Sequence, residues 1–188
     1  WVGETLTATA ADFVTLAQNH ISTSLRHRRM IATPTDISPT NGEFTVPDDY
    51  RIFRRVVELS GTTRRPLEYI TPEVSDSMYP TRPAGLGCHF TTVGNKIRVF
   101  PTITNDIELT YFADLAAFSA DGDTDWLLTK NPMLYLRASQ MMAADFLKDD
   151  TELQKQATLV STLISNLNAE NELGEFGNAG ITLSGNTP

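Results

Sequence analysis

The sequence DWLLTKNPMLYLRASQMMAADFLKDD, residues 125–150, decides the fold class because it contains a helix with an unusual pattern. Pro132 favours the first turn of a helix, and the residues that follow it, as far as Leu147, are apolar on nearly every face. A helix that is apolar all round has to be buried. We therefore expect residues 132–147 to form the core of a domain or part of a subunit interface, ended by an acidic break.

Two further helices are expected beside this one. Thr151 is placed as a helix cap, and apolar residues at one-face spacing predict a helix over residues 151–169. Upstream, Thr9 is a plausible cap, and apolar residues at spacings of three and four predict a helix over about 10–28. The three helices are expected to form an antiparallel bundle.

Residues 30–113 have the character of strands and turns. Turn sequences at Asn41-Gly42, Gly61 and Gly94-Asn95 each separate two apolar-rich runs. We therefore predict an arm of hairpins. Residues 106–112 alternate in polarity and are expected to extend the last hairpin into a three-stranded meander.

The predicted fold class is α+β: an antiparallel helical bundle of three main helices, with an inserted strand-rich arm of hairpins and a flexible C-terminal tail. A threonine followed by Pro72 adds a short helix to the arm. A single domain is expected over residues 1–170. The glycines beyond it predict an extended tail over residues 171–188.

The composition and motifs argue against several classes of function. Cys88 is the only cysteine, and the three histidines lack close spacing with carboxylates, so we expect no metal site. The chain has no nucleotide-binding glycine motif and no GxSxG. Cys88 and His89 are expected on opposite faces of a strand, which keeps them apart. We therefore expect no cofactor and no enzymatic activity. No window has the length of a membrane span, so we expect a soluble protein.

Charge is distributed unevenly along the chain. The net charge is -8, and residues 101–188 carry 4 basic and 13 acidic groups. Such a chain is a poor coat for nucleic acid, because affinity for phosphates depends on lysine and arginine. The arginines nevertheless gather in one cluster and two pairs: Arg26, Arg28 and Arg29, then Arg54-Arg55 and Arg64-Arg65. Two interpretations of the cluster stay open, interaction with the carbonyl end of the first helix and contact with a negatively charged partner.

Three aspartates precede Trp126 in a pattern that resembles part of a calcium-binding loop. They are Asp121, Asp123 and Asp125. The full EF-hand pattern fails, because Trp126 takes the glycine position and Pro132 takes the final glutamate position. The interpretation from residue types alone is a solvated acidic loop.

Four segments occur in an order that resembles the head-tail adaptor proteins of tailed bacteriophages. In chain order they are FVTLA with LR and RRM (13–30), VPDDY (46–50), PLEYITPE (66–73), and WLLTKNPMLYL leading to AADFLKDD (126–150). The resemblance covers most of residues 9–170. The glycine-rich tail departs from the family pattern.

The resemblance implies a structural virion protein, assembled in the host cytoplasm and located in the neck of the virion. Such a protein is a subunit of a homo-oligomeric ring, commonly of twelve copies, that joins the portal protein to a tail or nozzle protein. Viral DNA passes through the channel without specific binding, and no membrane is involved. A ring needs a heterologous interface, which the apolar helix and the strand-rich arm can supply.

In such a ring, three sets of residues are expected to have roles. The residues expected to dock on the portal are Leu173, Phe176, Ile181 and Leu183. The residues expected to face the channel, where an acidic wall repels phosphates, are Asp121, Asp123 and Asp125. The residues expected to face a neighbouring subunit or DNA are Arg26, Arg28, Arg29, Arg54 and Arg55.

An alternative function is a nucleic-acid-binding module that uses an arginine-rich face. It would add Arg64 and Arg65 to the five arginines above. The arginines are not interleaved with aromatic residues of the stacking kind, and they can equally form salt bridges with an acidic neighbour in a ring.

Overall fold

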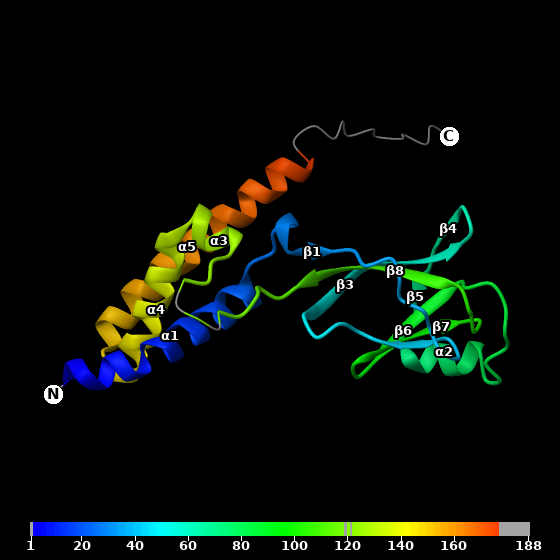
Figure 1. The fold of residues 1–188 in the computed structure, drawn as a ribbon, viewed down its shortest axis with the longest axis horizontal. Helices are drawn as coiled ribbons and strands as arrows, with labels where there is room; N and C mark the ends of the chain where they lie inside the picture. Colours follow the sequence, from blue (N-terminus) through cyan, green and yellow to red (C-terminus); the bar gives the residue numbers. More distant parts are fainter. Residues whose placement is uncertain (1, 119, 121, 177–188) are drawn as a thin grey trace, which may run out of the picture. The chain divides into compact units, whose positions relative to one another are not determined.

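The computed structural model describes residues 2–118, 120 and 122–176. The chain divides into two compact units (Figure 1). We call Trp1–Arg29 together with Leu115–Pro188 the helical unit, and Met30–Asp114 the sheet unit. The sheet unit is therefore an insertion between two segments of the helical unit.

The described residues of the helical unit form four α-helices. They are α1 (Val2–Ser24), α3 (Trp126–Lys130), α4 (Pro132–Leu147) and α5 (Asp150–Phe176). The long helix α4 packs against both α1 and α5 (Figure 1). Its bounds are those that the sequence predicted.

The core of the helical unit is built from one face of each long helix. Residues three or four apart in a helix share a face, and the buried side chains follow that spacing. The buried apolar residues of the three helices are Phe13, Ala17 and Ile21 in α1, Leu134, Tyr135, Ala138, Met141 and Ala144 in α4, and Val160, Ile164 and Leu167 in α5. The apolar periodicity of the sequence thus identifies the side of each helix that packs inward.

Helix α4 is not buried all round, contrary to the inference from its composition. Met133, Leu136, Phe146 and Leu147 are 46–54% exposed. We call these four residues the apolar face of α4. Within the described residues α4 packs against α1, α5 and the short α3, and these contacts leave part of its apolar surface exposed to solvent.

The ends of the outer helices differ from those expected. Helix α1 ends at Ser24 rather than near residue 28, and α5 continues to Phe176, so residues 171–176 are helical. The cap of α5 is Asp149 and not Thr151, because the Glu152 N–H donates to Asp149 Oδ1 at 3.1 Å. Whether residues 1–170 act as one adaptor domain stays a prediction.

The sheet unit contains eight strands. They are β1 (Ile31–Ala32), β2 (Glu43–Thr45), β3 (Tyr50–Ser60), β4 (Thr63–Pro66), β5 (Glu68–Tyr69), β6 (His89–Val93), β7 (Lys96–Phe100) and β8 (Asp106–Ala113). One sheet has the order β1-β8-β3-β4, and the other has the order β2-β7-β6-β5. A short 3-10 helix, Arg28–Met30, leads into the unit, and α2 (Pro72–Met78) lies between β5 and β6 in the chain.

The prediction of a three-helix bundle with an arm of hairpins is wrong, although the mixed α+β class is right. The structure has five α-helices in its described residues and two four-stranded sheets. Two predicted hairpins exist, β3–β4 and β6–β7. The predicted meander does not, because β8 pairs with β3 in the other sheet. Pairings between strands far apart in sequence have no local signal, so turn residues alone predicted separate hairpins.

Residues from both sheets form one core in the sheet unit. The cluster contains Phe44, Val56, Leu67, Phe90, Ile97, Val99, Ile103, Ile107, Leu109 and Tyr111. Each sheet therefore covers an apolar face of the other, which isolated hairpins could not do.

The turn before β2 depends on a glycine for two reasons. Gly42 has a φ of +73°, and a Cβ at this position would lie 3.1 Å from the carbonyl oxygen of Val99. Gly94 also has a positive φ, +60°, but a Cβ there would have open space. Backbone strain alone acts at Gly94, whereas strain and crowding against backbone act together at Gly42.

We expect Gly42→Ala to lower the free energy of unfolding by about 2–3 kcal/mol, and Gly94→Ala by about 1–2 kcal/mol, the cost of a left-handed non-glycine residue. Urea denaturation of the two variants measures the difference. Equal decreases in the free energy of unfolding would show that crowding against the Val99 carbonyl oxygen does not destabilise the Gly42 variant.

Candidate functional site

The predicted arginine cluster lies just beyond the end of α1. The Arg26 N–H donates to Asn168 Oδ1 at 3.0 Å, and the Arg28 N–H donates to Asn171 Oδ1 at 2.9 Å. Both asparagines belong to α5, which therefore holds the chain where it leaves α1. The arginines lie beyond the last turn of α1, which ends at Ser24, and their interaction with its carbonyl end stays a prediction.

Trp126, at the start of α3, completes this region. Its ring stacks on His27 with centroids 4.8 Å apart, and the Arg29 guanidinium carbon lies 5.6 Å from the indole centroid. Lys130 pairs with Glu170 at 2.7 Å. We call Arg26, Arg28, Arg29 and Lys130 the basic corner, since all four are exposed at the same end of the helical unit.

Gly174 makes room for one of these arginines. A Cβ at Gly174 would lie 2.7 Å from Arg28 Nη1. From the sequence this glycine was predicted to lie in the tail, and neither Asn168 nor Asn171 was among the predicted site residues. Asn171 continues the spacing of the buried residues Ile164 and Leu167 on α5, so an amide on an otherwise apolar stripe was the available signal.

The basic corner affects the titration of His27. The imidazole is only 3% exposed, and its Nδ1 accepts the Arg29 N–H at 3.1 Å. Burial first, then the positive charges of Lys130, Arg28 and Arg29, hold the pKa of His27 below its ordinary value of 6.5. The imidazole is therefore neutral at neutral pH, with Nδ1 as a hydrogen-bond acceptor.

We expect acid to destabilise the protein partly through His27. The pKa of His27 is lower in the folded chain than in the unfolded chain, so the unfolded chain binds more protons as the pH falls below 6.5. The stability that depends on neutral His27 is therefore complete above pH 6.5 and declines as the pH falls. His27→Gln should reduce the loss of unfolding free energy between pH 7.5 and pH 5.5, as measured by urea denaturation at both values. The matched control is His20→Gln, and a pH dependence reduced equally by both would contradict the assignment.

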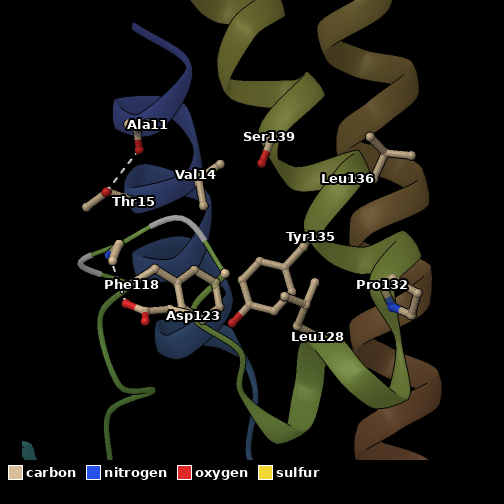
Figure 2. A pocket seen from close by; sticks show the side chains of 12 residues that line it. Ala11, Val14, Thr15, Phe118, Asp123, Leu128, Pro132, Tyr135, Leu136 and Ser139 are labelled. Atoms are coloured by element: carbon tan, nitrogen blue, oxygen red, sulfur yellow. Dashed lines mark hydrogen bonds between the residues drawn. The ribbon is translucent and has the colours of Figure 1, made fainter.

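A cavity of about 620 Å³ opens in the helical unit between α1, α4 and the residues before α3 (Figure 2). Its lining is mostly apolar or uncharged and includes Val14, Phe118, Leu128 and Leu136. Figure 2 shows the ring of Tyr135 on one side of the cavity beside Phe118, and the ring centroids are 5.5 Å apart. The lining also includes the hydroxyl groups of Thr15, Tyr135 and Ser139 and the carboxylate of Asp123.

Asp125 has a structural task next to this cavity. Its Oδ1 accepts the Leu128 N–H at 2.6 Å and caps α3, while its Oδ2 accepts the Tyr135 O–H at 2.5 Å. Burial, followed by the hydrogen bond to Asp125 and the charge of that carboxylate, raises the pKa of Tyr135. Asp125 thus joins α3 to α4, which is more than the solvated loop that the sequence predicted.

A family model described as SU10 adaptor protein matches residues 1–178 of the chain. The chain belongs to the SU10 adaptor protein family. This is a phage head-tail adaptor family, so the resemblance stated from the sequence is confirmed. The adaptor is therefore a structural component of a virion that contacts other capsid or tail components. No curated protein matches the chain.

The other predicted arginines of the adaptor belong to the sheet unit. Arg54 lies over the Phe112 ring at 5.9 Å, Arg55 is exposed, and Arg64 pairs with the buried carboxylate of Glu108. Arg65 lies beside Arg64 on β4. The arginine-rich face of the alternative function is thus divided between two units, and at least one of its members is engaged by a carboxylate.

The predicted acidic and tail residues of the adaptor are only partly described. Asp123 is exposed, and its Oδ2 accepts the Ala120 N–H at 2.9 Å. Leu173, near the end of α5, is 73% exposed. Asp121, the side chain of Phe176, and Ile181 and Leu183 lie outside the described residues.

The described residues of the adaptor hold neither a metal-binding group nor a membrane-spanning helix. No group of three His, Cys, Asp or Glu side chains among them is placed to hold a metal ion. No helix in that part of the chain is both long and apolar enough to cross a membrane. Cys88 is exposed, and neighbouring His89 is hydrogen-bonded to the Tyr79 hydroxyl at 2.7 Å.

Proposed function

We propose that this adaptor forms a closed ring, with the twelve copies common among head-tail adaptors, that joins the portal to the tail and surrounds the DNA channel. Its membership of a head-tail adaptor family supports the location. The observation that carries the ring is the apolar face of α4. Soluble monomers rarely expose a contiguous apolar surface without a partner for it.

The position of this face suits a contact between identical copies. Leu136 and Leu147 are each 50% exposed, whereas Leu134, Ala138 and Met141 of the same helix are buried. A face used against a different surface of the next copy gives a heterologous contact, which closes into a ring when the rotation per copy permits. Leu136 also lines the cavity of Figure 2, so a neighbour seated on α4 would cover both.

The acidic residues before α3 are proposed to approach the channel. Asp123 is exposed, and the chain as a whole has a net charge of -8. Like charges keep a moving DNA duplex from adhering to the wall. Asp125 contributes less to this role than the sequence suggested, because both of its oxygens accept hydrogen bonds within the adaptor.

The ring is tested by measuring the mass of the chain alone and on portal rings, followed by reconstruction of the complex. We expect a ring on the portal with Asp123 on the inner wall. Leu136→Glu should reduce ring occupancy at least tenfold, because a charge would be buried in the interface. Leu159→Glu, which alters an exposed leucine on α5, is the matched control. A wild-type chain that stays monomeric on portal rings would refute the ring, and Asp123 on the outer wall would refute the acidic lining.

The segment after Asn171 is proposed to dock on the portal. Leu173 is exposed at the end of α5, and residues 177–188 contain no charged side chain but include Ile181 and Leu183. An uncharged segment with spaced apolar residues can bind a groove and bury area there, at a cost in ordering.

Truncation after Phe176 retains all of α5 and isolates the contribution of the remaining residues. We expect it to weaken binding to isolated portal rings at least tenfold, as measured by calorimetry, while the thermal stability of the adaptor stays unchanged. The substitution Leu173→Ser tests the exposed end of α5 separately. Unchanged affinity in both variants would contradict the docking role.

A further inference from the structure

The two ends of the helical unit carry opposite charges. One end is the basic corner. At the other end, Asp145, Asp149 and Asp150 are exposed around the connection between α4 and α5, and they outnumber the one exposed cation in that connection, Lys148. We call these three residues the acidic turn. Only Asp149 has a local hydrogen-bonding task among the described residues, as the cap of α5.

Contacts within the helical unit place these surfaces far apart in one copy. Phe146, beside the acidic turn, contacts Phe13 near the middle of α1, with ring centroids 5.6 Å apart, whereas Asn171 accepts the N–H of Arg28 beyond the C-terminal end of α1. Helix α4 alone has 16 residues, or about 24 Å at 1.5 Å per residue. That separation exceeds the Debye length of about 8 Å at physiological salt, so the two surfaces cannot neutralise one another within a copy.

The arginines of the basic corner remain available to a partner. Among the described side chains, no carboxylate forms a salt bridge with Arg26, Arg28 or Arg29, and all three are exposed. Glu170, which pairs with Lys130, lies near enough for the charge of Arg28 to help lower its pKa. Arg29 is held over Trp126, and Arg28 lies in the space left by Gly174. Arginines held in place lose less entropy when they bind a carboxylate through two hydrogen bonds.

Each charged surface is accompanied by exposed apolar side chains. Phe146 and Leu147 adjoin the acidic turn, and Leu173 lies in the same part of α5 as the basic corner's partner Asn171. Apolar area beside complementary charge is the usual composition of a protein interface. The two surfaces are therefore complementary in charge, and each includes the apolar side chains that an interface needs.

We propose that the basic corner of one copy binds the acidic turn of a second copy, with arginine guanidinium groups on the carboxylates of Asp145 and Asp150. The contact is head-to-tail, since it uses different surfaces of the two copies, and it can repeat around an axis. This inference rests on the proposed ring and identifies the partner of the arginine cluster in it. It also accounts for a basic cluster in an acidic protein without a role in binding DNA.

The test uses two charge-reversed versions of the full chain, R28E/R29E and D145R/D150R. Asp149 is left intact because it caps α5. Each variant alone presents like charges at both surfaces and should form rings on the portal at least tenfold less well than the wild type. An equimolar mixture restores one attractive pair at every contact, so ring mass should return. D36R/D76R, which makes the same charge change at exposed residues of the sheet unit, should assemble as the wild type does.

Several results would overturn the proposal. The first is normal ring formation by either variant alone. The second is a mixture of the two variants that does not regain ring formation or that forms only dimers. Loss of DNA binding in R28E/R29E with normal assembly would assign the corner to nucleic acid instead. A wild-type chain that forms no ring would refute the proposed function, whereas normal rings from every variant would refute only this contact.

Thermal unfolding checks that both variants fold. If either does not, the single reversals R28E and D145R are mixed in the same way. Ring formation by the wild type at rising salt gives a second measurement without substitutions, because screening should weaken a charge-dependent contact. Rings unaffected by salt between 0.05 and roughly 0.5 M would count against the proposal.

Discussion

The helical unit consists of two chain segments separated by the whole sheet unit, so its integrity depends on contacts that hold those segments together. At the exit, Asn168 and Asn171 of α5 accept the backbone N–H groups of Arg26 and Arg28. At the return, the Gln18 side chain donates to the carbonyl oxygen of Ala116 at 2.5 Å. These bonds offset part of the entropy cost of closing a long loop. They also determine where the basic corner is presented.

Features encoded by neighbouring residues could be predicted from the sequence. The apolar residues of α4 gave its bounds, and proline at the first position marked both α4 and α2. Glycine turns located the β3–β4 and β6–β7 hairpins. In each of these cases the signal and the structure lie within a few residues of one another, so propensity and turn chemistry were sufficient.

Features that depend on distant residues could not be predicted in this way. The pairing of β3 with β8 joins Val56 to Leu109, and nothing local in either strand identifies the other. Asn171 accepts the hydrogen bond from the Arg28 N–H only because α5 lies beside the end of α1. Asp125 gained its task through Tyr135, which lies on the next helix. The sequence therefore indicated which residues form the candidate surfaces, namely the arginines and the apolar helix, but not how those residues are arranged.

A helix face can dock a partner reproducibly only if the helix is fixed in rotation about its axis. Apolar contacts alone allow some slippage, whereas polar contacts inside an interface specify one register. Between α4 and α5, Arg137 Nη1 donates to Gln156 Oε1 at 3.5 Å, and within α5 Gln156 Nε2 donates to Glu152 Oε1 at 2.5 Å. At the start of α4, the Tyr135 hydroxyl is tied to Asp125. Leu136 and Leu147 are exposed in this arrangement, so the rotation of α4 about its axis determines which apolar residues the adaptor offers to another copy.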